Sequence, residues 1–280
     1  MSSIEHCSPL PDQYRQQVSN GEALANELMY AIRDALTNSP RSLQTSIGPS
    51  EIGSPCNRRI GYKLLGIKVQ DDQRVNWKAA VGTGGHLLME GIFDRYNVQH
   101  AQVLGGHERF YIETKVVVND DGVDGSCDIY DRVTGTVIDW KFPGPTQLNK
   151  YRRQRHPGQQ YKVQAHLYGR GWQRAGLPVT RVMVVFLPRN GELDESYIWY
   201  EPYDEQVALD ALQRLYGITQ AVHVLGPAAL ELLPTADAYC TFCSYFKNHS
   251  TDLARGCPGD PASRINVPTP TMRDLVGSRA

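Results

Sequence analysis

The sequence predicts an α/β fold in which strands and helices alternate along the chain. Residues 125–141 form two short runs rich in Ile, Val, Tyr and Trp around Thr134-Gly135, a pattern typical of a β-hairpin. A second pair of runs, 182–187 and 196–200, flanks Asn190-Gly191 and predicts a buried strand with its partner. Segments with helical periodicity lie between and beside these strands. The 280 residues are enough for one large domain or two small ones.

The remaining elements divide the chain into three parts. We expect a polar N-terminal segment with one helix over 1–45, a main domain over 46–260 and a flexible tail over 261–280. The N-terminal helix carries an apolar stripe made of Ala23, Leu24, Leu28, Ile32 and Leu36. In the main domain, helices are expected over 77–96, 158–171 and 204–225, and a half-buried strand over 107–118.

Charge is distributed unevenly along the chain. The net charge is −1, yet the interval between Trp140 and Gly191 holds ten Lys and Arg residues and no Asp or Glu. Such a block favours a phosphate-bearing substrate, and a solvated, mildly basic surface is the alternative. The N-terminus lacks an apolar signal segment, and no apolar run approaches membrane-spanning length. We therefore expect a cytoplasmic protein whose cysteines are ligands rather than disulfides.

Acidic and basic side chains meet on one face of the predicted hairpin. With Thr134-Gly135 as the loop, Asp128 lies directly across from Lys141, and Asp139 shares that face because it is two residues from Lys141. Two carboxylates this close repel each other unless a cation lies between them, and oxygen ligands suit Mg²⁺ or Mn²⁺. Lys141 could position a water molecule or stabilise charge on a phosphate oxygen. The alternative is a solvent-exposed Asp–Lys pair.

Neighbouring elements offer further candidate side chains. His86 and Glu90 are one helical turn apart on the helix over 77–96, and His86 could supply a nitrogen ligand to the same metal. A single His on a helix is more often structural. Glu113, on the predicted strand before the hairpin, is a further acid that could lie near the site.

The helix over 158–171 presents Gln160, Gln164 and Tyr168 at successive turns. These side chains could hydrogen-bond phosphates or orient Lys141, and an ordinary helix surface is an equally good interpretation. A basic loop, predicted between the hairpin and this helix, contains Lys150, Arg152, Arg153 and Arg155.

In this order, the residues resemble the PD-(D/E)XK nucleases of the RecB type, and among them the CRISPR-associated (Cas-four type) and AddB-like iron–sulfur exonucleases. The resemblance covers the chain from about Ser46 to Cys257. Each motif alone is weak, but six in one order are specific. They are a Cys before an Arg-aromatic stretch (Cys56), a GxxxHxxxE helix (Gly82, His86, Glu90), a GxxD strand (Gly125, Asp128), an acid-x-Lys strand (Asp139, Lys141), a QxxxY helix (Gln164, Tyr168) and a C-terminal Cys-x-x-Cys with one further Cys.

The resemblance implies a restriction-endonuclease-like core: a mixed central sheet flanked by helices, with the N- and C-terminal segments joined by a metal cluster. It implies that the ligands of Mg²⁺ or Mn²⁺ are His86, Asp128, Asp139 and the backbone carbonyl of Trp140. Lys141 would help to activate the attacking water, and Gln164 and Tyr168 would support the lysine or the DNA backbone. The basic loop with Lys150, Arg152, Arg153 and Arg155 would bind DNA.

The same resemblance implies a [4Fe-4S] cluster that staples the two ends of the domain, with the ligands Cys56, Cys240, Cys243 and Cys257. One feature departs from the family pattern. Thirteen residues separate Cys243 from Cys257, more than such families usually show, and His249 lies between them. A zinc site is therefore the alternative, with the ligands Cys240, Cys243, His249 and Cys257.

The resulting prediction is a metal-dependent exonuclease that hydrolyses phosphodiester bonds from DNA ends, preferably single-stranded ones. Recombination, repair or phage DNA metabolism in a prokaryotic or phage-infected cell is the expected setting. The alternatives are an inactive nucleic-acid-binding module of the same fold and a structure-specific endonuclease. The complete set of His86, Asp128, Asp139 and Lys141 argues against an inactive module, because a degenerate nuclease would be expected to lose one member.

Overall fold

The computed structural model describes residues 21–38, 46–68, 77–236 and 240–262. The chain divides into two compact units, one made of Met1–Gln44 and Gln73–Ala80 and the other of Thr45–Asp72 and Val81–Ala280. Most of the predicted polar N-terminal segment and C-terminal tail lies outside the described residues, as does Cys7.

The first unit contains helix α2 (Gly21–Thr37), which confirms the predicted N-terminal helix. Three residues of its apolar stripe, Leu24, Leu28 and Ile32, are 47%, 55% and 43% exposed. None of the helices in the described part of the chain combines the length and apolar character that crossing a membrane requires.

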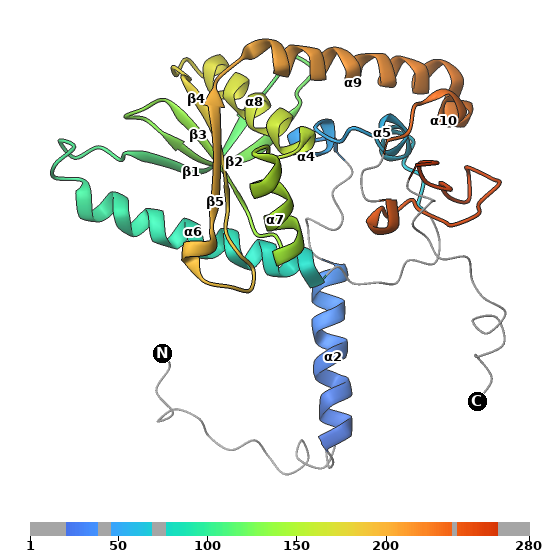
Figure 1. Cartoon of the computed structure of the whole chain (residues 1–280), viewed down its shortest axis with the longest axis horizontal. Coiled ribbons are helices and arrows are strands. Elements are labelled where there is room, and N and C mark those ends of the chain that lie inside the picture. The colour runs from blue at the N-terminus through green and yellow to red at the C-terminus, as the bar shows by residue number, and fades with distance from the viewer. Residues whose placement is uncertain (1–20, 39–45, 69–76, 237–239, 263–280) are drawn as a thin grey trace. The chain divides into compact units, whose positions relative to one another are not determined.

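The second unit is built on a mixed five-stranded sheet, which confirms the predicted α/β fold class (Figure 1). The strands follow one another in the order β1-β2-β3-β4-β5, with β3 and β4 parallel and the other neighbours antiparallel. Their bounds are β1 Phe110–Val117, β2 Asp124–Asp131, β3 Thr136–Lys141, β4 Arg181–Phe186 and β5 Tyr197–Pro202. The parallel pair needs a crossover, which is made by α7 (Pro145–Gln154) and α8 (Gln159–Arg174).

Helices cover both faces of the sheet (Figure 1). Helix α6 (Trp77–His100) packs Met89 and Phe93 against one face, where Trp140 and Phe110 are buried. Helix α8 covers the other face with Ala165, Tyr168 and Trp172. Helix α9 (Glu205–Leu225) packs in turn on α8, along a seam of small and branched apolar side chains. The predicted helices and strands of the main domain are thus confirmed, with ends that shift by a few residues.

Short helices connect the beginning and end of this unit. They are α4 (Pro49–Ile52), α5 (Asn57–Leu64), α10 (Ala229–Leu232) and the 3₁₀ turns η3 (Gly226–Ala228) and η4 (Cys240–Phe242). A further 3₁₀ turn, η2 (Leu193–Glu195), lies between β4 and β5. Tyr62 of α5 stacks on Tyr245 with ring centroids 4.8 Å apart, and its hydroxyl donates to the carbonyl of Leu253 at 2.6 Å. Residues near the two ends of the domain are therefore in direct contact.

The basic segment predicted as a loop is helix α7, so that prediction is wrong. Pro145 occupies the first helical turn, where its fixed φ favours a helix and its missing N–H costs nothing. Leu148 and Tyr151 are one turn apart and are both buried, which anchors one side of the helix to the sheet. Arg155 ends α7 in the left-handed conformation, with a φ of 48°.

The register of the predicted β2–β3 hairpin is also wrong, by two residues. Tyr130 pairs with Val137 and Asp131 with Thr136, so the loop spans the four residues 132–135. Asp131 explains the longer loop, because its carboxylate accepts hydrogen bonds from the Val133 N–H at 3.1 Å and the Thr134 hydroxyl at 2.7 Å. Asp128 consequently does not lie across from Lys141.

Candidate metal centre and cysteine pocket

The end of the β2–β3 hairpin opens at Asp128. Regular pairing of the two strands ends at Ile129↔Ile138. Two residues further along β3, the Trp140 N–H donates instead to the Asp128 carboxylate at 2.6 Å. The Asp128 side chain thus takes the place of a backbone acceptor in the ladder. This holds its carboxylate between the two strands, where it is 6% exposed.

Glu113 lies on β1, the other neighbour of β2. The pairs on either side of it, Ile112↔Ile129 and Thr114↔Cys127, set Glu113 opposite Asp128. Its φ is 43°, a value that few residues other than glycine adopt. The alternation of side chains along β1 is interrupted at Glu113. Tyr111 and Val116 pack against the same core although they are five residues apart, an odd number that regular alternation would place on opposite faces.

His86 of α6 completes a cluster with these two acids. Its Nδ1 lies 3.3 Å from Asp128 Oδ1 and 3.8 Å from Glu113 Oε1. In the described part of the chain, these three are the only His, Cys, Asp or Glu side chains whose ligand atoms all lie within 4.8 Å of one another. Burial disfavours the protonated imidazole, but Asp128 and Glu113 outweigh burial and raise the pKa of His86 to about 9.

Asp139 and Lys141 lie beside this cluster on the face of β3 that α8 covers. Asp139 is 1% exposed and forms an ion pair with Lys141. Burial raises the pKa of Asp139 to about 6, Lys141 opposes that change, and Asp128 adds to it. Burial alone would lower the pKa of Lys141, but the two carboxylates raise it above its usual value. Lys141 therefore keeps its positive charge at neutral pH.

Helix α8 contacts Asp139 and Lys141 on the face of β3 that it covers. Gln164 donates to Asp139 Oδ1 at 3.0 Å and lies 3.4 Å from the Tyr168 hydroxyl. Tyr168 packs close to Gly125, where a Cβ would approach its ring to 3.3 Å and Pro49 to 2.7 Å. Close packing thus accounts for the glycine of the GxxD motif.

Gln160 does not belong to this stripe, because its side chain donates instead to the carbonyl of Ser50 at 2.9 Å. Its place is taken by Tyr161, which sequence reasoning missed. The Tyr161 ring centroid lies 5.0 Å from Lys141 Nζ. The spacing of Tyr161, Gln164 and Tyr168 at i, i+3 and i+7 was the available signal.

The predicted DNA-binding residues lie on the second half of α7 and just after it. Arg152, Arg153 and Arg155 are exposed, and Lys150 is half-buried. Arg152 donates to Asn149 at 3.0 Å and to the carbonyl of Glu195. The structure thus places these residues one short connection beyond Lys141.

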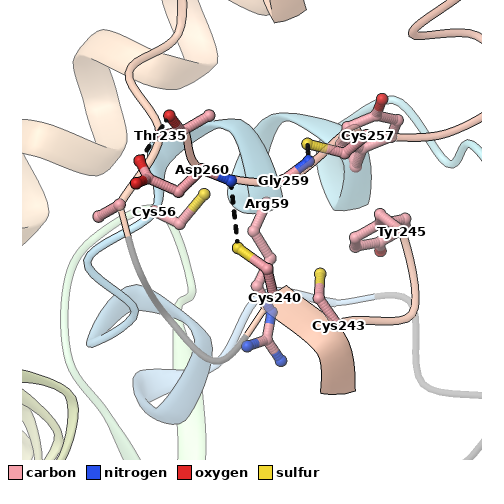
Figure 2. Close-up of a pocket in the computed structure, with 11 residues that line it drawn as sticks. Cys56, Arg59, Thr235, Cys240, Cys243, Tyr245, Cys257, Gly259 and Asp260 are labelled. Carbon is pink, nitrogen blue, oxygen red and sulfur yellow. Dashed lines mark hydrogen bonds between the residues drawn. The ribbon is translucent and has the colours of Figure 1, made fainter. Parts of the chain in front are cut away.

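The four cysteines predicted as cluster ligands line one small cavity (Figure 2). Cys56 comes from the residue that precedes α5, Cys240 from η4, and Cys243 and Cys257 from the C-terminal segment. Two sulfurs accept backbone hydrogen bonds, Cys257 from Gly259 at 3.4 Å and Cys240 from Asp260 at 3.3 Å. Folding thus brings Cys56 to cysteines that lie far away in the sequence.

The surroundings of this cavity differ from those of the acidic cluster. Arg59 lines it, and His249 is exposed and is not among its lining residues. Burial raises the pKa of the Cys243 thiol, while the N–H of Tyr245 and the Arg59 guanidinium act in the opposite direction. Burial prevails, so the pKa of the Cys243 thiol lies above its ordinary value.

No protein-family model and no curated protein sequence matches the chain. Three solved structures that are similar to it are exonucleases, each at 13% sequence identity. An alkaline exonuclease (LHK-Exo) from Laribacter hongkongensis has a TM-score of 0.36 over 65% of this chain and 95% of its own. LHK-Exo in complex with dAMP has a TM-score of 0.35 over 66% and 97%. A phage-related exonuclease from Haemophilus somnus 129PT has a TM-score of 0.30 over 52% and 72%.

Proposed function

We propose that this protein is a divalent-metal-dependent deoxyribonuclease that hydrolyses phosphodiester bonds from DNA ends. The observation that carries the proposal is the grouping of His86, Glu113 and Asp128 beside a buried Asp139–Lys141 pair. Carboxylates on three neighbouring strands face two cationic groups, Lys141 and His86, so the site carries excess negative charge. Two of the three carboxylates are buried, where such charge is costly.

A divalent cation relieves this excess, and the available donors suit Mg²⁺ or Mn²⁺. We propose His86, Asp128, Asp139 and the backbone carbonyl of Trp140 as its ligands, with Glu113 as an additional carboxylate ligand. When bound, such a cation lowers the pKa of a coordinated water and neutralises charge on a phosphate oxygen. The Trp140 N–H helps because it fixes the Asp128 carboxylate in place.

The other side chains orient this site and the substrate. Lys141 keeps its charge and would hydrogen-bond the attacking water or a phosphate oxygen. Gln164 fixes the rotamer of Asp139, and Tyr168 supports Gln164. Exposed arginines of α7 are available to contact DNA phosphates. The choice of DNA as substrate follows from the ordered motifs that resemble RecB-type nucleases.

Digestion of three labelled substrates tests this function. Wild-type protein with Mn²⁺ is incubated with end-labelled linear single-stranded DNA, linear duplex DNA and covalently closed single-stranded circles. We expect nucleotides or short fragments from linear substrates, intact circles, and no products in EDTA. Cleaved circles would instead establish an endonuclease. DNA binding without any products in Mg²⁺ or Mn²⁺ would establish the inactive binding module.

We also propose that Cys56, Cys240, Cys243 and Cys257 hold a [4Fe-4S] cluster. Four thiolates with N–H···S hydrogen bonds suit iron–sulfur ligation. The exposed position of His249 argues against the zinc site that would use it as a ligand.

A further inference from the structure

The ammonium of Lys141 contacts two groups in the described part of the chain. One is the Asp139 carboxylate, and the other is the ring of Tyr161, 5.0 Å from Nζ to the centroid. A cation within about 6 Å of an aromatic ring is attracted to the negative face of that ring. The Lys141 side chain is only 16% exposed, so water screens this attraction weakly.

The Tyr161 ring is held by its neighbours. It meets Tyr151 at 6.0 Å with an interplanar angle of 61°, and Phe186 at 6.0 Å with an angle of 55°. Phe186 is the residue of β4 that pairs with Lys141 on β3. The ring and the lysine are thus fixed to the same part of the sheet, and the ring can set the position of the ammonium.

Helix α8 therefore contacts both members of the Asp-x-Lys pair, through Gln164 to Asp139 and through Tyr161 to Lys141. The two contacts differ in chemistry. A carboxylate can accept a proton from the ammonium, whereas an aromatic face attracts the charge and accepts no proton. When Asp139 is engaged by a cation, its attraction for Lys141 weakens, and the ring contact remains.

We infer that Tyr161 is a positioning residue that holds the charged Lys141 at the reaction centre through the face of its ring. This inference rests on the proposed nuclease function. It predicts that loss of the aromatic face lowers the rate of the chemical step. The affinities for DNA and for Mn²⁺ should not change, because the effect of Tyr161 is exerted through its contact with Lys141. The phenol hydroxyl is not required, so phenylalanine should replace tyrosine.

The test compares Tyr161→Leu and Tyr161→Phe with wild type, using linear single-stranded DNA and saturating Mn²⁺. We expect Tyr161→Leu to lower kcat on the order of tenfold with KM unchanged, and Tyr161→Phe to retain kcat within about twofold. Tyr197→Leu is the matched control. It removes a ring that stacks on the same Phe186 at 5.8 Å without contacting Lys141, so kcat should be unchanged.

A second comparison separates positioning from general packing. In a Lys141→Ala background, Tyr161→Leu should cause no further loss of the residual rate, because its effect acts through the lysine. Equal losses in both backgrounds would overturn the inference. So would equal kcat values in Tyr161→Leu and wild type.

A series of fluorinated phenylalanines at position 161 covers the case in which the leucine variant fails to fold. Each added fluorine withdraws negative charge from the ring face with little change in size, so log kcat should fall at each step. A constant kcat across the series would refute the role of the ring face. Inactivity of the wild-type protein would overturn the proposed function, and this inference with it. Active wild type with a flat series would overturn the inference alone.

Discussion

Proton binding at individual residues should control cation binding. Burial raises the pKa of Asp139 to about 6, and the acids beside His86 raise the pKa of its imidazole to about 9. Near neutral pH, the metal-free site therefore carries a protonated imidazole that repels a cation. Each ligand must lose its proton before it can bind a metal. A rise in pH should thus strengthen cation binding.

We predict that the affinity for Mn²⁺ increases as pH rises between 6 and 9, the interval set by Asp139 and His86. Isothermal titration calorimetry in two buffers of different ionisation enthalpy measures both the affinity and the number of protons released. Binding should release protons throughout this interval. An affinity that stays constant, with no proton release, would show that these groups are not ligands.

At this scale, the sequence predicted which residues would matter better than how they meet. Asp139 and Lys141 share a face because alternation along a strand is regular. The position of Asp128 was mistaken, because hydrogen bonds made by Asp131 lengthen the turn. The place of Glu113 opposite Asp128 does not follow from strand alternation, because a positive φ at Glu113 interrupts the alternation of β1. Side-chain periodicity carries no signal for either event.

At the scale of elements, the packing of α4 against α8 links the segment of Cys56 to the helix that contacts the site. A Cβ added to Gly53 would overlap the carbonyl oxygen of Gln160 and lie 3.0 Å from its carbon. Both atoms belong to the backbone, so neither can move aside without shifting the helix. Arg214 of α9 secures the same segment through the carbonyls of Ser54, at 2.9 Å, and Ile52.

We predict that Gly53→Ala lowers the free energy of unfolding by about 1–3 kcal/mol, as overpacking does. Urea denaturation measures it. The matched control is Gly217→Ala in α9, where no atom lies within 4 Å of the added Cβ. That change should raise stability by about 0.5–1 kcal/mol, because glycine weakens a helix interior. Equal effects of the two substitutions would mean that α4 and α8 are not closely packed.

Helix α7 shows why the basic segment was mistaken for a loop. Pro143-Gly144-Pro145 in the sequence signals a break in the chain, and the helix that begins at Pro145 is only ten residues long. Its stability comes from burying Leu148 and Tyr151 against the sheet, a tertiary effect that local propensity does not report. As a result, Arg152 and Arg153 project from a helix that is packed against the sheet.

Joint replacement of Arg152, Arg153 and Arg155 by Ala should weaken binding to single-stranded DNA. It should also reduce the slope of log affinity against log salt by up to about 2, because each phosphate contact releases counterions. Fluorescence anisotropy in Ca²⁺ at several salt concentrations measures this slope. An equal loss of charge elsewhere serves as control, through Ala replacements of Lys115, Arg174 and Arg181. An unchanged slope in the α7 variant would mean that this helix points away from the substrate.

At the scale of the whole molecule, the cysteine pocket joins segments that are about two hundred residues apart, from Cys56 to Cys257. No local pattern in the sequence predicts that meeting. Composition suggested only that the thiols are ligands, and the resemblance to iron–sulfur nucleases supplied the pairing of Cys56 with the C-terminal cysteines. The stacked rings of Tyr62 and Tyr245 reinforce the same junction.

We predict that anaerobically purified protein is brown, contains iron rather than zinc, and loses its colour on oxidation. Cys56→Ala should lose the iron and lower the midpoint of thermal unfolding, because metal binding stabilises only the folded pocket. His249→Ala should retain the iron, since the His249 side chain is exposed and outside the cavity. Colourless protein with stoichiometric zinc that His249→Ala releases would establish the zinc site instead.

The central claim is that Asp139 and its neighbours hold the cation that drives DNA hydrolysis. The most direct measurement is the rate of nucleotide release from end-labelled linear single-stranded DNA as Mn²⁺ is increased. Wild-type and Asp139→Asn proteins are compared with Asp131→Asn, which removes the charge of a buried carboxylate paired with Arg109, at a temperature where all three are folded. We predict saturable activity in wild type and Asp131→Asn, and a loss of more than about 100-fold in Asp139→Asn. Full activity of Asp139→Asn in Mg²⁺ or Mn²⁺ would contradict the claim.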